Sequence, residues 1–311
     1  MSSASDVLFV HALSPVHVGS GSSVDIVDLP LIREHATGFP LIPGSSMKGA
    51  LRAWVGTLDD AELEDEVFGS RKGADDTAEN ATFAGAVAFS DARLLLLPVR
   101  SSRGVFAMAT CAIALRRFQR ILAETTPKDP VVQALGRLLV KAGELTDDGS
   151  ALVAPKSLLA GSARWSLEDL EAKGVENADV GEVGLFLAKK LLDGEDDYLT
   201  GRLCVLPDEV FQYFTEQATE VVARIRIDPK RRTVQRGGLW NEENLPAETV
   251  LVGVTHSFGS RRPEPAPRRS GREILDALWA KDVHRLHTFG GKETVGHGRV
   301  RLSRVQGEVA S

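Results

Sequence analysis

The sequence predicts an α+β fold, because runs typical of β-strands are mixed with separate segments of helical periodicity. Two further observations bound the size of the folded unit. Apolar residues make up 43% of the chain, which is enough for a hydrophobic core. A length of 311 residues is compatible with one large domain or two small ones.

The first half of the chain is expected to contain four strands and four helices. Strand patterns occur at 7–13, 83–89, 93–99 and 106–113. Helical patterns start near residue 46 and recur at 59–68, 114–124 and 131–142. The helix at 59–68 has an acidic face that we expect to be solvated. A polar stretch at 70–82 is expected to be a loop.

The second half is expected to carry a long hairpin and a glycine-rich loop. Residues 143–170 are ambiguous between strand and loop, and helices are predicted at 182–192, 208–218 and 273–279. The strand at 221–227 is predicted to pair with 249–258, so that the intervening stretch forms the hairpin. Three prolines make 262–270 a semi-rigid connector. Strands at 286–289 and 299–305 flank the glycine-rich loop.

The segment Pro43-Gly44-Ser45-Ser46 is a turn that opens a helix, with Ser45 or Ser46 as the expected N-cap. Lys48 stands in the first turn, where the helix dipole disfavours a cation by roughly 0.3–1 kcal/mol. Gly49 stands inside the helix, where glycine costs about 1 kcal/mol relative to alanine. A phosphate at the helix N-terminus would explain both residues, and Arg52 would share a face with Lys48. The alternative is an ordinary capped helix.

Two aspartates precede this turn. Asp25 and Asp28 lie a short loop upstream, and two carboxylates near a phosphate site are suited to a hard divalent cation such as Mg²⁺. The alternative is that both are solvated loop residues. The run Gly19-Ser20-Gly21-Ser22-Ser23 is not a dinucleotide-binding motif, because Val24 replaces the third glycine and no helix pattern follows.

The glycine-rich loop at 290–298 is a second candidate for phosphate contact. It has the spacing of a nucleotide-binding loop, but His297 replaces the lysine and Gly298 replaces the hydroxyl residue. Backbone N–H groups at Gly290, Gly291, Gly296 and Gly298 are still expected to face a phosphate. The alternative is a hairpin that needs positive φ at several positions.

The net charge of −6 argues against nucleic-acid binding, but the distribution of charge argues for it. Residues 224–236 have a local charge of +5, and residues 261–272 have a local charge of +4. Arginine forms bidentate contacts with phosphate, so both stretches are candidates for phosphate tracking. The arginines proposed here as phosphate contacts are Arg224, Arg226, Arg231 and Arg232.

Other chemistries find little support in the sequence. Cys111 and Cys204 match no metal spacing and fit a reducing compartment as core residues. The N-terminus has no basic region typical of a signal peptide, and no apolar run approaches the ~20 residues of a membrane span. We therefore expect a cytoplasmic protein that does not bind membranes.

Several motifs together resemble the RAMP superfamily of CRISPR proteins, and within it the repeated backbone subunit of the type III-B (Cmr) effector complex. They are His17-Val18-Gly19-Ser20-Gly21, Val27-Asp28-Leu29-Pro30, Thr37-Gly38-Phe39-Pro40, the segment 43–52, the strands at 85–92 and 97–100, Leu239–Pro246, and the loop 290–298. The resemblance extends from residue 8 to about residue 302.

The resemblance implies a single RAMP-type domain over residues 1–311. Its palm would be ferredoxin-like, of the RRM type, with an inserted helical subdomain at about 56–82 and 114–145 and a β-hairpin thumb at about 224–248. It further implies a backbone subunit that binds crRNA and complementary target RNA, stacks with copies of itself in a filament, and contacts other Cmr subunits. Asp28 inherits the role of catalytic, Mg²⁺-binding aspartate of an endoribonuclease, and His17 matches a recurrent histidine as a possible accessory residue.

Three alternatives remain open at this point. The chain is a non-catalytic RNA-binding scaffold, or the backbone subunit of the type III-A (Csm) complex, or a guide-processing endonuclease that uses His17 as a general base. The segments 37–40 and 239–246 favour the Cmr subunit over the Csm subunit. How Glu242 and Glu243 lie relative to Asp28 is left open by the sequence.

Overall fold

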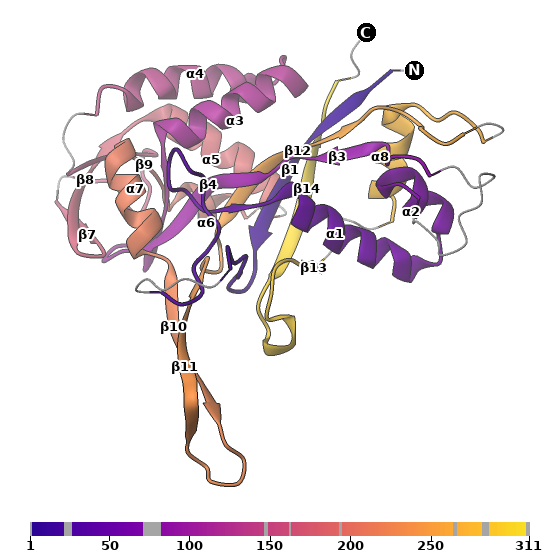
Figure 1. Ribbon diagram of the computed structural model, residues 1–311. Coiled ribbons are helices and arrows are strands. Elements are labelled where there is room, and N and C mark those ends of the chain that lie inside the picture. Colours follow the sequence, from indigo (N-terminus) through magenta and orange to yellow (C-terminus); the bar gives the residue numbers. More distant parts are fainter. Residues whose placement is uncertain are drawn as a thin grey trace.

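The computed structural model describes residues 2–21, 27–70, 82–145, 149–161, 163–192, 195–263, 266–281 and 286–308. Its centre is one large mixed sheet (Figure 1). The first strand, β1 (Ala4–Ala12), lies between β12 (Val250–Ser257) and β14 (Arg299–Gln306) and pairs antiparallel with both. β13 (Leu286–Thr288) extends the sheet beyond β14, and β3 (Val87–Phe89) pairs with β12.

The other half of the sheet continues from β12. Its order is β12-β4-β5-β9-β6-β8-β7, with parallel pairing between β5 and β9 and between β6 and β8. The short β2 (Leu41–Ile42) pairs with β4. The remaining bounds are β4 (Ala92–Arg100), β5 (Phe106–Cys111), β6 (Ser150–Val153), β7 (Trp165–Leu167), β8 (Leu170–Glu176) and β9 (Leu203–Leu206).

The helices form two groups on opposite sides of the central strands (Figure 1). One group is α1 (Gly44–Val55), α2 (Ala61–Phe68) and α8 (Gly271–Trp279), which share a hydrophobic cluster with β1 and β14. The other is α3 (Ala112–Thr125), α4 (Pro130–Ala142) and α5 (Ala178–Leu191), which pack against one another over a second cluster. Two further helices are α6 (Asp196–Thr200) and α7 (Asp208–Gln217).

The two stretches predicted as one inserted helical subdomain therefore lie in different groups. The stretch 56–82 contributes α2, which contacts α1 and α8, whereas 114–145 contributes most of α3 and all of α4. Of the predicted loop at 70–82, residues 71–81 lie outside the described residues.

A separate two-stranded hairpin projects from the body (Figure 1). It consists of β10 (Glu220–Ile227) and β11 (Val234–Asn244), joined by a turn in which Asp228 Oδ1 accepts from the backbone N–H groups of Lys230 and Arg231. The predicted pairing of 221–227 with 249–258 is wrong. Residues 250–257 are the central strand β12, whose apolar first half is buried where it pairs with β1 and β4, and β10 pairs with the nearer, more polar β11.

The start of α1 also differs from the prediction. The helix begins at Gly44, its N-cap is Pro43, and no side chain caps it. Instead, Asp91 Oδ1 accepts a hydrogen bond of 2.9 Å from the Gly44 backbone N–H. A side chain at Gly44 would clash with the Phe89 carbonyl oxygen, so only glycine allows α1 to approach β3 this closely. The carboxylate of Asp91, a residue distant in sequence, thus takes the place of the serine cap that the sequence predicts.

Within the described residues, no helix is long and apolar enough to cross a membrane. Both cysteines are buried and free, as expected for core residues. Burial raises the pKa of the Cys204 thiol to about 12.

Candidate functional site

The loop that carries Asp28 is docked along the base of the projecting hairpin. Leu29 forms a parallel bridge with Glu242, through a 3.1 Å bond from its N–H to the Asn241 carbonyl and a 3.0 Å bond from the Glu243 N–H to the Leu29 carbonyl. The exposed side chain of Asp28 accepts a 2.7 Å hydrogen bond from the Asn241 N–H at Oδ2. The backbone therefore fixes this carboxylate at the edge of β11.

The buried side chain of Glu243 also holds the loop that carries Asp28. Its side chain is 7% exposed and makes an ion pair with Arg33. It also accepts hydrogen bonds of 2.9 Å from the Leu31 N–H and from the Thr219 hydroxyl. With both oxygens engaged inside the fold, Glu243 positions the Asp28 loop and is not a reacting group.

Glu242 points to a different set of partners. It is fully buried, with Lys292 Nζ 3.3 Å from Oε2 and Arg224 Nη2 3.4 Å from Oε1. Burial by itself raises the pKa of Glu242, but the hydrogen bond and charge of Lys292, and the charges of Arg224 and His17, outweigh it and lower the pKa below the ordinary value. Glu242 is therefore ionised at neutral pH.

His297 completes this group in its neutral form. Burial and then the positive charge of Arg224 lower the pKa of the imidazole, although Glu242 opposes the shift. Arg224 Nη2 lies 2.8 Å from His297 Nε2, and His297 Nδ1 lies 3.1 Å from Asn244 Oδ1. Because a guanidinium only donates, Nε2 is the acceptor and Nδ1 carries the proton.

His17 lies at the same junction. Its imidazole is 7% exposed and its Nδ1 donates a 2.7 Å bond to the Glu243 carbonyl, because a carbonyl oxygen only accepts. Its own carbonyl accepts a 2.9 Å bond from the Gly291 N–H. The structure thus brings together His17, the base of β11 and the glycine-rich loop, which are far apart in sequence.

The glycine-rich loop needs glycine for conformational reasons. Gly290, Gly296 and Gly298 have φ of 86°, 87° and 81°, the positive values that the hairpin alternative requires. Side chains at Gly290 and Gly298 would also clash with the carbonyl oxygens of His17 and Phe289. The glycines therefore place the loop, while the side chain of Lys292 faces Glu242.

A groove connects this loop with α1. It has a volume of about 730 Å³, and its lining includes Ser46 and Trp54 on one side and His287, Gly290 and Glu293 on the other. The rings of Trp54 and His287 make an edge-on contact at 4.8 Å between centroids. Ser46 and Gly290, two residues predicted from separate motifs to contact phosphate, therefore line one groove.

The other predicted residues of α1 differ in their surroundings. Ser45 and Gly49 are exposed, and no atom lies within 4 Å of where a Gly49 side chain would start. Burial, followed by the charges of Arg52 and Arg261, lowers the pKa of Lys48. Arg52 is used inside the fold, donating 2.9 Å to Glu64 Oε1 and 2.7 Å to the Gly69 carbonyl, and so ties α1 to α2.

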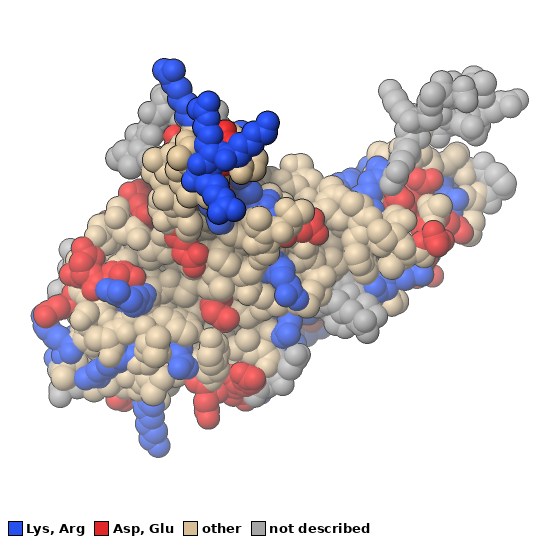
Figure 2. Space-filling view, turned by 90° about the horizontal axis from the view of Figure 1, so that it is seen from below, with Lys and Arg blue, Asp and Glu red and all other residues tan. Residues whose placement is uncertain are grey.

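The two arginine-rich stretches have different environments. In the hairpin, Arg226, Arg231 and Arg232 are exposed, and Figure 2 shows the basic side chains gathered over the projecting end. In the connector, Arg262 pairs with Glu62, and Arg269 Nη1 lies 2.7 Å from Glu66 Oε2.

The expectation that 261–272 tracks phosphate is therefore not supported by these contacts, and the acidic segment 59–66 is not simply a solvated face. Arg272 Nη2 lies 2.6 Å from the buried Asp6, and Lys281 Nζ lies 2.7 Å from Asp60. The local charge pattern misleads here because the fold brings acids from distant segments onto the connector.

No metal-binding cluster accompanies Asp28 in the part of the chain that the structure describes. No three His, Cys, Asp or Glu side chains there are placed to hold a metal ion. Asp25, the second predicted ligand, lies outside the described residues. The described side chains therefore do not form a protein metal site by themselves.

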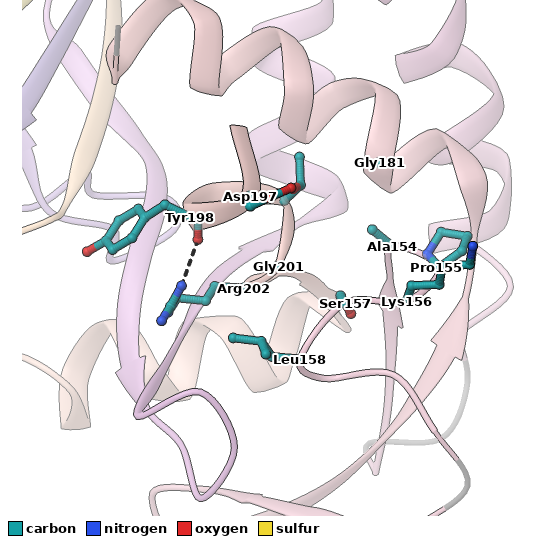
Figure 3. Close-up of a pocket in the computed structure, with 11 residues that line it drawn as sticks. Ala154, Pro155, Lys156, Ser157, Leu158, Gly181, Asp197, Tyr198, Gly201 and Arg202 are labelled. Carbon is teal, nitrogen blue, oxygen red and sulfur yellow. Dashed lines mark hydrogen bonds between the residues drawn. The ribbon is translucent and has the colours of Figure 1, made fainter. Parts of the chain in front are cut away.

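A second cavity lies away from this junction (Figure 3). It has a volume of about 610 Å³ and is lined by residues 154–158, Gly181, 197–198 and 200–202. Arg202 Nη1 donates to the Tyr198 carbonyl at 3.1 Å along its wall. None of the predicted site residues line it, so it does not contribute to the site at the hairpin base.

A large mixed sheet with a projecting hairpin and a glycine-rich C-terminal loop agrees with the family comparison. The model of the RAMP superfamily matches residues 9–301, so the chain belongs to the RAMP superfamily. The sequence is also 32% identical over 301 residues to the CRISPR system Cmr endoribonuclease Cmr4 of Pyrococcus furiosus, covering 94% of this chain and 93% of the relative. The predicted relationship to the type III-B backbone subunit is confirmed.

Other relatives agree with this placement. The CRISPR system CMR subunit Cmr4 of Saccharolobus solfataricus is 25% identical over 312 residues, with 94% of each chain covered. Among solved structures, the apo type III-B Cmr-beta complex contains a chain with a TM-score of 0.70 and 25% identity, covering 97% of both chains. Oligomeric Cmr4 from Pyrococcus furiosus has a TM-score of 0.66 at 23% identity, covering 98% and 99%, which shows the shared fold.

Proposed function

We propose that this protein is a crRNA-binding backbone subunit of a type III-B ribonucleoprotein that also cleaves the complementary target RNA. The observation that carries the proposal is the position of Asp28, an exposed carboxylate fixed by the Asn241 N–H at the base of an arginine-bearing hairpin. The relative from Pyrococcus furiosus is named an endoribonuclease, and one similar structure is a Cmr complex bound to cognate target RNA.

The body of the sheet is proposed as the palm and the β10–β11 hairpin as the thumb. The groove lined by Ser46 and Gly290 would hold the guide backbone. Exposed arginines of the hairpin would contact the guide–target duplex. Backbone contacts of this kind do not depend on base sequence, which suits a subunit repeated along one guide.

Cleavage is proposed to use the target's own 2′-hydroxyl. Splaying of a nucleotide by the hairpin would allow its 2′-oxygen to attack the adjacent phosphorus in line. Asp28 would accept the 2′-hydroxyl proton as the new O–P bond forms. The P–O5′ bond then breaks and the leaving oxygen gains a proton, giving a 2′,3′-cyclic phosphate and a 5′-hydroxyl. Much of the acceleration would come from the geometry imposed by the assembled duplex, so the isolated subunit would be nearly inactive.

The Mg²⁺ requirement implied by the resemblance stays a prediction. Asp28 is an oxygen ligand of the kind that Mg²⁺ prefers, and bound Mg²⁺ would neutralise phosphate charge. Because the described residues contain no cluster of three or more ligands, RNA oxygens and water would have to contribute to the coordination.

The scaffold alternative differs only in the role of Asp28. In that case Asp28 would only hold its loop in place by accepting the hydrogen bond from the Asn241 N–H. A guide-processing enzyme with His17 as base receives less support, because the imidazole is 7% exposed and its Nδ1 is bound to the Glu243 carbonyl. The type III-A alternative is not favoured by the relatives, which are Cmr proteins.

The test is cleavage of target RNA by the reconstituted complex with Mg²⁺, comparing wild type with Asp28→Asn. Asparagine keeps an oxygen for the Asn241 N–H, so folding and guide binding should be unchanged while cleavage falls by at least about 10²-fold, as for loss of a general base. A target with a 2′-deoxyribose at the cut should resist both complexes. Unchanged cutting by Asp28→Asn would make the chain a scaffold.

A further inference from the structure

We propose that Lys292 and Arg224 form a clamp for the scissile phosphate, positioned by the buried carboxylate of Glu242. This inference rests on the proposed function and adds the residues that stabilise the phosphate charge. The resemblance assigns no role to Lys292, and the local charge pattern predicts only a general phosphate contact for Arg224. The inference arises because Glu242, the residue after the Asn241 that holds Asp28, is surrounded by basic groups, and because the described residues contain no metal-ligand cluster.

The exposure of the three side chains is uneven. The Glu242 side chain is 0% exposed, whereas those of Lys292 and Arg224 are 35% and 32% exposed. One buried carboxylate thus faces two cations that both reach solvent. The trio has a net charge of +1, and with His297 neutral its solvent side presents positive charge. A phosphate oxygen can approach both cations without displacing Glu242.

Each cation is held in place by a second contact. His297 Nε2 accepts from Arg224, and its own orientation is fixed by Asn244. Lys292 Nζ lies 5.7 Å above the Trp240 ring. The backbone of Lys292 has a φ of 69°, a left-handed conformation that is unfavourable for lysine and that places its side chain over β11. Groups held rigidly in this way lose little freedom when they bind charge.

The clamp and Asp28 are organised by three consecutive residues of β11. The Asn241 N–H holds Asp28, the preceding Trp240 lies under Lys292, and the following Glu242 binds both cations. Because Asn241 stands between Trp240 and Glu242 along β11, the clamp and the Asp28 carboxylate are held by neighbouring residues of one strand, and the proposal places the scissile phosphate between them. Attack on phosphorus places negative charge on the non-bridging oxygens, and preorganised cations stabilise that charge.

The competing explanation is that the cations only neutralise Glu242. The two explanations predict different effects of replacing a non-bridging phosphate oxygen. If Lys292 contacts a non-bridging oxygen in the transition state, replacing that oxygen by sulfur and removing the ammonium should not have additive effects. If Lys292 only stabilises the fold, the sulfur effect should be the same with and without it.

The experiment is single-turnover cleavage by reconstituted complexes carrying Lys292→Gln, Lys292→Arg or Glu242→Gln. Lys141→Gln on α4 is the matched control, because its ammonium pairs with Glu144 on the surface. We expect a loss of about 10²–10³-fold for Lys292→Gln, as for an oxyanion donor. Lys292→Arg should stay within about tenfold because it keeps the charge, and Glu242→Gln should reduce the rate with guide binding intact.

The same complexes are then given a target with a phosphorothioate at the cut. The sulfur should slow wild type and the Lys141 variant equally and should slow Lys292→Gln little further. Wild-type cutting by Lys292→Gln, or an unchanged sulfur effect in it, would overturn the clamp. If Asp28→Asn is inactive in the same assay while Lys292→Gln is not, the clamp alone fails; if Asp28→Asn also cuts normally, the proposed function fails with it.

Discussion

The two arginine-rich stretches look alike in sequence and have different roles in the folded chain. Residues 224–236 form most of a projecting hairpin whose outer arginines are exposed (Figure 2). Residues 261–272 lie beside α2 and β1, and three of their arginines pair with Glu62, Glu66 and Asp6. Clustered arginines form an anion-binding surface only where the fold places no carboxylates against them. We expect the first stretch to affect RNA binding and the second to affect stability.

The largest expected effect in the second stretch follows from Arg272→Ala. Asp6 is fully buried and is held by Arg272 at 2.6 Å and by Arg304 at 3.2 Å. Removing one cation leaves a partly compensated buried carboxylate, which should lower the free energy of unfolding by about 3 kcal/mol. Urea denaturation measures this value, with Arg231→Ala at the hairpin end expected to change it by less than about 0.5 kcal/mol. Equal effects at both positions would remove the distinction between the stretches.

The second prediction concerns the salt dependence of RNA binding. Replacing Arg231 and Arg232 by glutamine should reduce the slope of log K against log salt by about 0.7 for each phosphate that the variant no longer neutralises. The same change at Arg262 and Arg269 should leave the slope unchanged, because both already pair with acids of α2. Anisotropy of labelled guide RNA over a KCl series measures both slopes. A reduced slope for the Arg262 and Arg269 variant would show that the connector also contacts phosphate.

The smallest effect should be seen at Asp60, which connects α2 to α8. The hydrogen bond from Lys281, followed by that from the Leu63 N–H, lowers the pKa of Asp60 in the folded state. A carboxylate with a lowered folded pKa stabilises the fold above its unfolded pKa of about 3.9 and loses this contribution as pH falls through the folded pKa. Asp60→Asn keeps a capping side chain but removes the charge.

The variant should therefore be less stable than wild type at pH 7, by about 0.5 kcal/mol for an exposed pair, and the two should converge near pH 2. Denaturation at several pH values follows this difference. A difference that does not change with pH would attribute the effect to helix capping and not to the ion pair.

The proposed catalytic region also depends partly on local sequence and partly on contacts between distant segments. The motif around Asp28 identified the candidate residue. Its bond from the Asn241 N–H, however, joins segments more than 200 residues apart. The contact between Glu242 and Lys292 joins residues 50 positions apart. Lys292 was not predicted because a lysine in a glycine-rich loop has no periodic signal, and its proposed role depends on its contact with a buried acid. The alternation of Trp240, Glu242 and Asn244 along one strand was the only local hint.

By itself the sequence determined the secondary elements with strong periodicity, the family and the motifs that contain Asp28 and the glycine-rich loop. Periodicity is a local property, since each helical or strand face depends on side chains a few residues apart. Tertiary structure decided that β11, and not β12, completes the hairpin, that Asp91 replaces a serine cap, and that acids neutralise the second arginine-rich stretch. These outcomes depend on which distant segments share a surface, because hydrogen bonds and ion pairs act only at contact distance, and a one-dimensional pattern does not contain that information.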